Sequence, residues 1–276
     1  MKKVRLDSFL VEEGYFETKS KASASILAGD VKINDEVITK SGFQINPEKK
    51  YNIEIKTIPY VSRGGFKLEK ALKTFDVNVK DRICLDAGAS TGGFTDCLLQ
   101  NGAKFVYAVD VGYGQFAWKL RTDERVKVIE KTNLKVCNFE NIYSENDTIA
   151  DLLVMDVSFI SIEKVIPNLK KLLKPDFHEM ICLIKPQFEA GKSALNKKGI
   201  VRDKKDHVRV LNELIAFFVS CGLSVRGVIP SGIRGGDGNV EYLAYLCIEN
   251  TAPNVPIDGK KLVDKAFDTS GNVFDK

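Results

Sequence analysis

A regular alternation of strand and helix patterns between residues 66 and 248 limits the possible folds of this chain more than any other feature. Short apolar runs suited to strands occupy residues 83–85, 105–109, 126–129, 152–155, 180–184, 223–229 and 242–248. Amphipathic stretches such as 160–173 and 208–219 separate most of these runs. Alternation of this kind predicts a mostly parallel sheet with helices on both faces. A glycine-rich loop without a helix joins the last two runs, so we expect those strands to pair antiparallel.

The first sixty residues have a different pattern and predict a separate small α+β domain over residues 1–59. Leu6, Phe9 and Leu10 have helical spacing, and a second helix is expected to start at Thr18 or Ser20 and to run to residue 27. Strand runs follow at 31–33, 37–38 and 51–55, and the first two suggest a hairpin. Residues 60–65 are expected to be a linker, 66–252 a second domain, and 253–276 a polar tail without a clear role.

Composition narrows the class of protein without identifying it. The 276 residues include 41 Lys and Arg against 37 Asp and Glu, and this net charge of +4 permits nucleic-acid binding without requiring it. The six cysteines form no C-x-x-C pair, so neither a zinc site nor a redox motif is expected. No apolar run approaches the roughly 18 residues of a membrane span, and no signal peptide is evident. We therefore expect a cytoplasmic protein, monomeric and without metal or membrane contacts.

The loop directly after the first strand of the alternating region, residues 86–94, is the most informative motif. A dinucleotide-binding fold needs G-x-G-x-x-G, and the spacing in this loop misses that pattern. Gly88, Ser90 and Gly92 do satisfy the G-x-S-x-G nucleophile elbow of hydrolases. A hydrolase would also need a histidine late in the chain. Of the two histidines, His178 and His207, the second lies in a charged stretch that resembles a solvated helix start.

Binding of S-adenosyl-L-methionine is the interpretation that the next strand favours. Small residues let the loop backbone approach the methionine part of this cofactor closely, and Asp86 is expected near its ammonium group. Asp110 ends the following strand, where an acid can hold the ribose hydroxyls. The predicted cofactor-binding residues of the loop are Gly88, Ala89, Ser90, Gly92, Gly93 and Phe94. Seven strands with an antiparallel last pair then predict an α/β, Rossmann-like class I methyltransferase fold.

Charged side chains at the ends of the later strands indicate the kind of methyl acceptor. Asp156 and Lys185 follow the fourth and fifth strands, and Glu241 begins the antiparallel last strand, so all three are expected at one edge of the sheet. Lys67, on a helix expected over residues 66–75, could reach the same edge. Residues 156–159 lack the Pro-Pro and Pro-Cys motifs typical of enzymes that methylate bases. A sugar hydroxyl must lose its proton as the methyl arrives, and a desolvated neutral lysine can act as general base.

Five segments together resemble the TlyA family of ribosomal-RNA 2′-O-methyltransferases, which have also been labelled haemolysin A. These segments are residues 62–68, 86–94, 110–114, 185–189 and 238–243. The resemblance implies an RNA methyltransferase domain of the FtsJ type, with Lys67, Asp156, Lys185 and Glu241 as the catalytic set and Lys185 as the base. It also implies that Asn133 lies near the adenine of the cofactor, and that the target nucleotide is a cytidine.

The same resemblance covers the first domain, where residues 5–55 look like the RNA-binding domain of the ribosomal-protein S-four type. The family's basic pair at the start of its second helix corresponds here to Lys19 and Lys21. Together with Arg5, Lys32, Arg63 and the basic segment 185–209, these lysines could form one RNA-binding track across both domains. Two places depart from the family's pattern. Asn34-Asp35 stands where Asn-Gly is usual, so we expect a different type of hairpin turn. Ser231-Gly232 stands where Ser-Pro is usual, which should loosen the loop that leads to Glu241.

Positive charge is concentrated between residues 185 and 209, where eight Lys and Arg stand against three Asp and Glu. We expect this segment to be a mobile lid that contacts phosphates and makes RNA binding depend on salt. The expected partner is ribosomal RNA or a ribosomal subunit. Two other functions stay open at this point, namely a membrane-lytic haemolysin and an RNA-binding assembly factor without catalysis.

Overall fold

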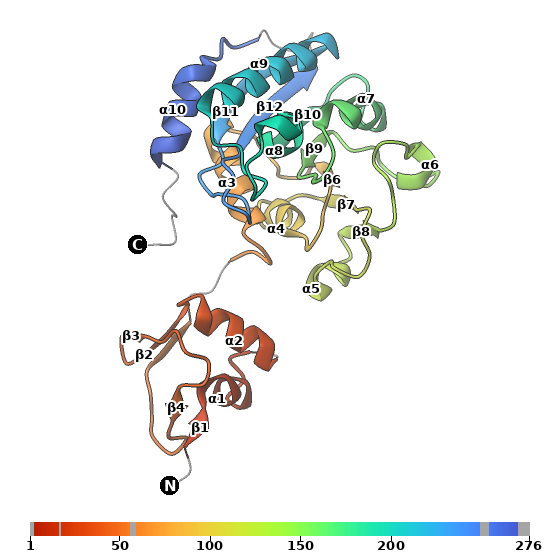
Figure 1. Cartoon of the computed structure of the whole chain (residues 1–276). Coiled ribbons are helices and arrows are strands. Elements are labelled where there is room, and N and C mark those ends of the chain that lie inside the picture. The colour runs from red at the N-terminus through yellow and green to blue at the C-terminus, as the bar shows by residue number, and fades with distance from the viewer. Residues whose placement is uncertain (1–2, 17, 56–58, 249–253, 270–276) are drawn as a thin grey trace. The chain divides into compact units, whose positions relative to one another are not determined.

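The computed structural model describes residues 3–16, 18–55, 59–248 and 254–269 of the chain. The chain divides into two compact units, Met1–Pro59 and Tyr60–Lys276. Each unit has a hydrophobic core of its own. Figure 1 labels the helices and strands of both units.

The first unit packs two short helices against short strands. Helices α1 (Leu6–Glu12) and α2 (Lys19–Leu27) are followed by β2 (Val31–Ile33), which pairs with β3 (Glu36–Val37) and β5 (Ile53–Ile55). A second small sheet pairs β1 (Val4–Arg5) with β4 (Gln44–Ile45). Thr18 caps α2 by accepting a hydrogen bond from the Lys21 N–H, as its position before a helical pattern predicts. Buried side chains from both helices and from β2 form the core.

The hairpin between β2 and β3 corrects the expectation of a different turn type. Only Asn34 and Asp35 separate the paired residues Ile33 and Glu36. Their φ angles are 50° and 70°, so both lie in the left-handed region that a type I′ turn requires. Asn and Asp tolerate this region better than most residues with a Cβ, and the two-residue turn is retained without glycine.

The second unit is built on one seven-stranded sheet, with the strand order β11-β12-β10-β9-β6-β7-β8. The bounds are β6 (Ile83–Ala87), β7 (Phe105–Val109), β8 (Val126–Ile129), β9 (Leu152–Met155), β10 (Glu179–Ile184), β11 (Leu223–Pro230) and β12 (Tyr242–Ile248). Five strands are parallel, and β12 pairs antiparallel with both β10 and β11. The predicted Rossmann-like sheet with an antiparallel last pair is therefore confirmed.

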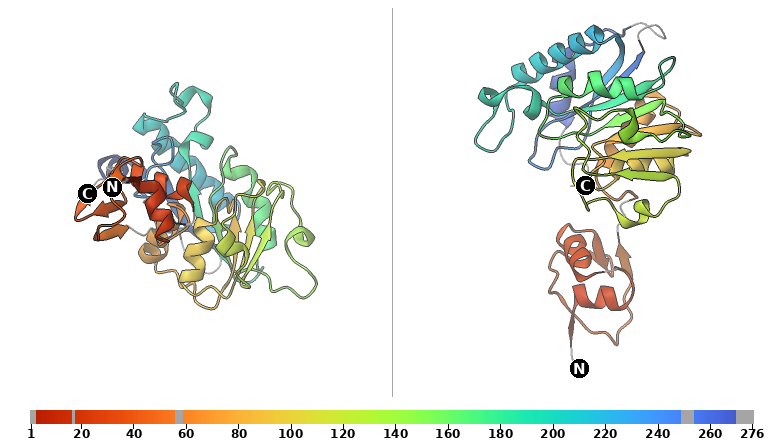
Figure 2. Two further views of the ribbon diagram at one scale, coloured as in Figure 1. Left: turned by 90° about the horizontal axis from the view of Figure 1, so that it is seen from below. Right: turned by 90° about the vertical axis from the view of Figure 1, so that its right-hand side faces the viewer.

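Helices cover both faces of this sheet (Figure 2). On one face lie α3 (Gly64–Phe75), α4 (Gly93–Gln100) and α5 (Trp118–Arg121), whose apolar side chains share a core with Cys84 and Val106. On the other lie α7 (Ile166–Leu169), α9 (Lys204–Ser220) and α10 (Gly259–Thr269), packed with Leu85 and Tyr107. The remaining short helices are α6 (Phe139–Ile142), α8 (Pro186–Glu189), η1 (Ile162–Lys164), η2 (Lys170–Leu172) and η3 (Lys192–Ala194).

Two segments at the borders of this unit differ from expectation. The expected linker 60–65 is part of the folded unit, because Tyr60 is buried and packs edge-on against Phe66. A side chain on Gly65 would overlap the Tyr60 ring, so this contact requires glycine. The expected polar tail contains α10, whose Val263 and Ala266 are buried in the core. Residues 253 and 270–276 of that predicted tail lie outside the described part of the chain.

Candidate active site

The carboxyl ends of the parallel strands meet at one edge of the sheet, and the loop after β6 lies across it. Gly88 has a φ of +86°, and a Cβ at this position would lie 2.5 Å from the backbone oxygen of Asp156. This close approach joins the loop after β6 to the loop after β9, and only glycine permits it. Gly88, Ser90 and Asp156 consequently line two adjoining cavities.

The larger cavity, of about 420 Å³, lies beside the ends of β7 and β8. Asp110 faces it and accepts hydrogen bonds from the N–H groups of Ser90 (2.7 Å) and Gly112 (2.6 Å). Each carboxylate oxygen has more than one acceptor position, so Asp110 can still bind ribose hydroxyls. The wall also includes Asn133 and a set of apolar side chains, namely Val111, Leu134, Val157, Ile160 and Val165. A polar end with an apolar wall fits a nucleoside.

The smaller cavity, of about 210 Å³, lies between the loop after β6 and the start of α3. Ala89, Gly93 and Phe94 of the predicted cofactor loop line it, together with Lys67 and Asp156. The lining residues that were not predicted for catalysis or cofactor binding include three with polar side chains near α3 and in the loop before Glu241, namely Ser62, Arg63 and Arg234. The two cavities share Gly88, Ser90 and Asp156 in their linings.

Two predicted cofactor residues lie behind the cavity walls. Asp86 is fully buried beneath the loop, where its Oδ2 accepts a hydrogen bond from the Thr95 hydroxyl at 2.6 Å. Burial, and the nearby Asp156 and Asp110 carboxylates, raise the pKa of Asp86 to about 7 despite that hydrogen bond. Gly92 is buried too, and a Cβ at this position would lie 2.5 Å from Leu120 Cδ1. Both residues shape the loop, and neither lines the two cavities.

The four predicted catalytic residues form two lysine–carboxylate pairs. Lys67 Nζ donates to Glu241 Oε2 at 2.5 Å, and these side chains are only 10% and 3% exposed. Lys185 Nζ lies 2.6 Å from Asp156 Oδ1, and these side chains are 12% and 24% exposed. The first pair joins α3 to the start of β12, and the second joins the ends of β9 and β10. The first pair is buried and the second is partly buried, which is unusual for lysine, ordinarily a surface residue.

Two polar residues near these pairs were missed at the level of the sequence. Ser158 accepts a hydrogen bond from Lys185 Nζ at 2.7 Å, so this amine has an oxygen on two sides. Arg234 belongs to the glycine-rich loop that precedes Glu241 and donates to the Gly238 carbonyl at 2.9 Å. A cation in a glycine-rich loop just before a predicted catalytic acid is a signal that could have identified it.

The histidines exclude the hydrolase interpretation and correct one expectation. His207 is fully buried in α9 and is not part of a solvated helix start. Its Nε2 donates to the Val201 carbonyl, and its Nδ1 accepts from the Tyr242 hydroxyl, each at 3.0 Å. His178 lies just before β10, at the opposite edge of the sheet, and bonds to the Lys174 carbonyl. Neither imidazole can therefore activate Ser90.

The residues predicted to bind RNA in the first unit differ in their surroundings. Arg5 pairs with the buried Asp7 at 2.5 Å, and Lys19 lies 3.8 Å from the same carboxylate. These cations lower the pKa of Asp7. Lys32 lies 3.7 Å from Glu54 on the neighbouring strand, and Lys21 is exposed at the start of α2. Arg63 lies in the second unit, directly before α3 and beside Lys67 in the smaller cavity.

The basic segment 185–209 has more structure than a loop. It contains α8, the short helix η3 and the start of α9, and Leu195 pairs with Val201 through an isolated bridge. Asn239, two residues before Glu241, holds this turn by accepting from the Val201 N–H and donating to the Gly199 carbonyl. The segment is thus fastened to the loop that carries a predicted catalytic acid.

Two properties of the described residues bear on the other interpretations. No helix between residues 3 and 269, in the parts that the structure describes, has the length and apolar content needed to cross a membrane. The same residues contain no cluster of three or more His, Cys, Asp or Glu side chains able to hold a metal ion.

The sheet order, the cofactor-sized cavity at its carboxyl edge and the charged pairs beside it define a class I methyltransferase. The FtsJ-like methyltransferase family matches residues 60–247, and the S4 domain family matches residues 4–49. The chain therefore belongs to the FtsJ-like methyltransferase family, whose methyl donor is S-adenosyl-L-methionine. This confirms the predicted class of enzyme and its cofactor.

Individual relatives cover most of the chain. Hemolysin A of Brachyspira hyodysenteriae is 47% identical over 246 residues, which are 89% of this chain and all of that protein. The 16S/23S rRNA (cytidine-2'-O)-methyltransferase TlyA of Mycobacterium tuberculosis is 39% identical over 89% of this chain and 90% of its own length. A solved structure from Streptococcus thermophilus, whose description names a hemolysin, is 42% identical with a TM-score of 0.75 and covers 98% of this chain and 97% of its own. The resemblance to TlyA proteins is confirmed.

Proposed function

We propose that this protein methylates the ribose 2′-hydroxyl of a cytidine in ribosomal RNA, with Lys185 as the general base. The observation that carries the proposal is Asp156, which lines both cavities and also pairs with Lys185 at 2.6 Å. The methyl donor and the acceptor hydroxyl would thus meet beside an amine that can take a proton. S-adenosyl-L-methionine, when bound, supplies an electrophilic methyl group on a sulfonium.

Lys185 accepts the proton of the 2′-hydroxyl at Nζ, while Asp156 and Ser158 orient that amine from two sides. A weakly acidic hydroxyl becomes a strong nucleophile only when its proton leaves as the new bond forms. The ammonium that Lys185 becomes remains next to the Asp156 carboxylate, which stabilises the added charge. Lys185 is only 12% exposed, so little bulk water competes for the proton.

Lys67 lines the smaller cavity, and Glu241 holds it there from behind the cavity surface. Their pair is more buried than the Lys185–Asp156 pair, so the two side chains are fixed against each other and form a rigid wall. Lys67 lines the cavity along with Arg63 and Arg234. Glu241 balances the charge of Lys67, so Arg63 and Arg234 are the cavity cations that favour the phosphates flanking a ribose, and Arg suits phosphate oxygens because of its fork of donors. This arrangement favours an RNA nucleotide as acceptor.

Asp110 is proposed to hold the ribose hydroxyls of the cofactor, and Asn133 to lie beside its adenine in the apolar part of the larger cavity. Asp86 would act through the loop that it supports from beneath, because its carboxylate does not reach the cavity surface. The S4 unit, with Arg5, Lys19, Lys21 and Lys32, is proposed to grip ribosomal RNA or a ribosomal subunit. Relatives named for methylation of cytidine in 16S and 23S rRNA support this substrate.

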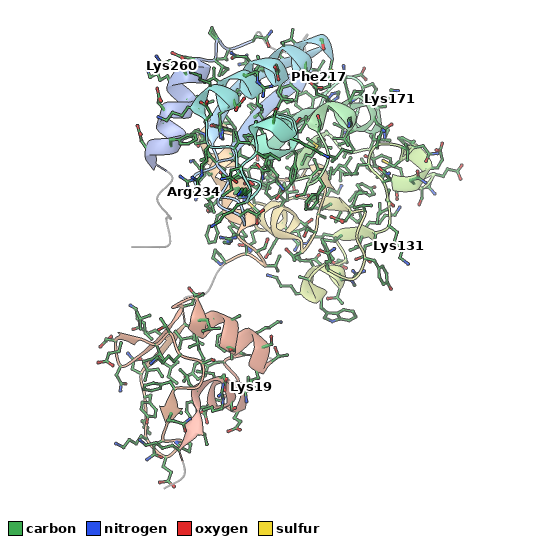
Figure 3. The ribbon with its side chains drawn as sticks, viewed as in Figure 1. Lys19, Lys131, Lys171, Phe217, Arg234 and Lys260 are labelled. Atoms are coloured by element: carbon green, nitrogen blue, oxygen red, sulfur yellow. The ribbon has the colours of Figure 1, made fainter. Side chains whose placement is uncertain are left out.

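The test is transfer of a tritiated methyl group onto ribosomal RNA, offered as naked RNA, as separate subunits and as whole ribosomes. The wild type is expected to label RNA at a ribose 2′-oxygen of a cytidine, located by resistance to alkaline cleavage. Lys185→Ala should lose activity by about 10²-fold or more, the scale of a lost general base. Lys171→Ala is the matched control, since Lys171 is an exposed lysine of η2 outside both cavities (Figure 3).

No labelling of any RNA form by the wild type would overturn the proposal. Labelling of a base in place of the ribose would overturn the acceptor, and equal activity of Lys185→Ala would overturn the role of the lysine. RNA binding without labelling would favour an assembly factor. Lysis of red cells by the purified protein, free of RNA and cofactor, would favour the activity for which Hemolysin A is named.

A further inference from the structure

Helix α10 lies beyond residues 60–247, the part of the chain that the FtsJ-like family matches. It packs on α9 and β11, and its Val263 and Ala266 are buried in the core on that face of the sheet. Phe267 packs edge-on against the buried ring of His207 at 5.0 Å. The apolar face of α10 is therefore already covered by the domain, and only its polar face is available to a partner.

A groove of about 330 Å³ runs between the starts of α9 and α10. Its six lining residues are Lys204, Lys205, Val208, Lys260, Val263 and Asp264. Three lysines thus stand against one carboxylate. Lys204 Nζ pairs with Asp264 Oδ1 at 2.7 Å, which lowers the pKa of Asp264 and keeps it ionised. The charges of Lys205 and Lys260 are then in excess, and both side chains are exposed. Lys260 is labelled in Figure 3.

The groove lies near the catalytic edge of the sheet. β10 ends at that edge, and the chain reaches the start of α9 through the basic segment that Asn239 fastens beside Glu241. The other end of α10 approaches the same edge, because Ala266 and Glu241 line a common small void. Exposed Lys197, Lys198 and Arg202 precede α9 and add positive charge on the path between the two places.

We propose that this groove between α9 and α10 binds phosphate groups of the RNA substrate, outside the cavity in which methyl transfer takes place. The inference rests on the proposed function and extends its RNA contact to an element that the family does not cover. Val208 and Val263 form an apolar floor along which lysine stems can lie while their ammonium groups face outward. An RNA strand entering the smaller cavity continues along this groove, and each phosphate that it places there releases a counterion.

RNA fits this groove better than a membrane surface does. A helix that binds a bilayer inserts an apolar face between lipids, and the apolar face of α10 is occupied by α9 and β11. The part of α10 that faces out offers Lys260 and Lys261 beside the exposed Asp258 and Asp268, a hydrophilic surface that favours a hydrated partner over lipid tails. A lipid headgroup therefore serves as an alternative outcome of the test.

The test compares the wild type with the double variant Lys205→Glu, Lys260→Glu in binding to the RNA that it methylates. For two lost phosphate contacts the slope of log affinity against log salt should fall by about 1.4 to 1.8. The wild type then loses about 10-fold more affinity than the variant between 50 and 200 mM salt. The KM for RNA should rise, while kcat at saturating RNA and the affinity for S-adenosyl-L-methionine should stay unchanged.

The double variant Lys104→Glu, Lys171→Glu is the control, because it changes the net charge equally with two exposed lysines outside the groove. A salt slope of the groove variant equal to that of the wild type or of this control would overturn the proposal. The proposal would also be overturned if the groove variant lost binding to phosphatidylglycerol vesicles while its binding to phosphatidylcholine vesicles and to RNA stayed at the wild-type level. The neutral variant Lys205→Gln, Lys260→Gln should show a smaller decrease in the salt slope of RNA binding. This comparison separates the loss of charge from misfolding.

RNA binding and methyl transfer are measured separately, so the outcomes can be told apart. An unchanged salt slope with a wild type that methylates RNA refutes the groove alone. A wild type that labels no RNA refutes the proposed function, whatever the groove variant does.

Discussion

The buried Lys67–Glu241 pair should be detectable as a large coupling energy in a double-mutant cycle. The two side chains are 174 positions apart in the chain, they meet at 2.5 Å, and they are 10% and 3% exposed. Glu241→Gln leaves the Lys67 charge buried without a counter-charge, and Lys67→Met does the same to Glu241. Removing one partner of a buried pair costs about 3–5 kcal/mol, so each single variant should lose that much stability.

The double variant Lys67→Met, Glu241→Gln should lose much less than the sum of the two single losses, because no unpaired charge is left behind. The measurement is urea unfolding of the four proteins at pH 7, followed by far-UV circular dichroism. Methyl transfer to RNA should be lost in both single variants and in the double variant. The double variant regains stability because no charge is left unpaired, but it does not regain the Lys67 side chain that lines the cavity. Recovery of stability without activity is the expected signature.

Two results would refute this reasoning. Additive losses in the double variant would show that the two side chains are not coupled. Single losses below about 1 kcal/mol would match a solvent-exposed ion pair and would contradict the burial of this one.

Three further predictions follow from other buried groups of the second unit. Gly88→Ala adds a Cβ 2.5 Å from the Asp156 oxygen at a φ of +86°, so it should displace Asp156 and lower methyl transfer by about 10²-fold in a folded protein. Asp86 keeps its proton up to about pH 7 in the folded state, against 3.8 when unfolded, so its contribution to stability falls as pH rises through that window. Asp86→Asn should remove this slope of up to roughly 1.4 kcal/mol per pH unit in urea unfolding. Burial lowers the pKa of His207, so its unfolded form takes a proton first and stability falls below about pH 6.5; His207→Gln should flatten that fall.

Each of these has a control or a contrary outcome. Gly14→Ala shares the positive φ (+78°) but adds a methyl with nothing within 4 Å, so methyl transfer should be nearly unchanged, and equal effects of both glycine changes would contradict the packing argument. An Asp86→Asn protein with the pH profile of the wild type would show that Asp86 titrates normally. If His207→Gln loses stability equally at pH 5 and pH 8, the imidazole acts only through its hydrogen bonds to Val201 and Tyr242.

Much of the fold could be predicted from the sequence, because hydrophobic periodicity and the residues that cap helices or form turns are local properties. The strands at 105–109, 126–129, 152–155 and 242–248 have the predicted bounds, and the antiparallel last pair follows from a connection without a helix. Helix α2 begins where Thr18 can cap it. The placement of Asp110, Asp156 and Lys185 at one edge also follows from strand order alone, since parallel strands end on the same side.

Pairings between distant elements were decided by the tertiary structure. No local pattern predicts the contact of Lys67 with Glu241 or that of Ser158 with Lys185. Nor does one predict that Arg234 lines the cavity. These contacts depend on how α3 and the loops cross the sheet. The local sequence also gave a wrong prediction for the burial of His207. His207 stands among charged residues and is fully buried.

The segment after residue 253 shows the same division between sequence and structure. Its lysines and aspartates give it a polar composition, which predicted a tail, while four apolar residues at helical spacing place α10 against α9. The sequence by itself determined the class of fold, the edge of the sheet at which ligands bind, and the chemistry available there. Only the packed structure decided which charges lose their water and which become partners, because desolvation is a property of neighbours that lie far apart in the chain.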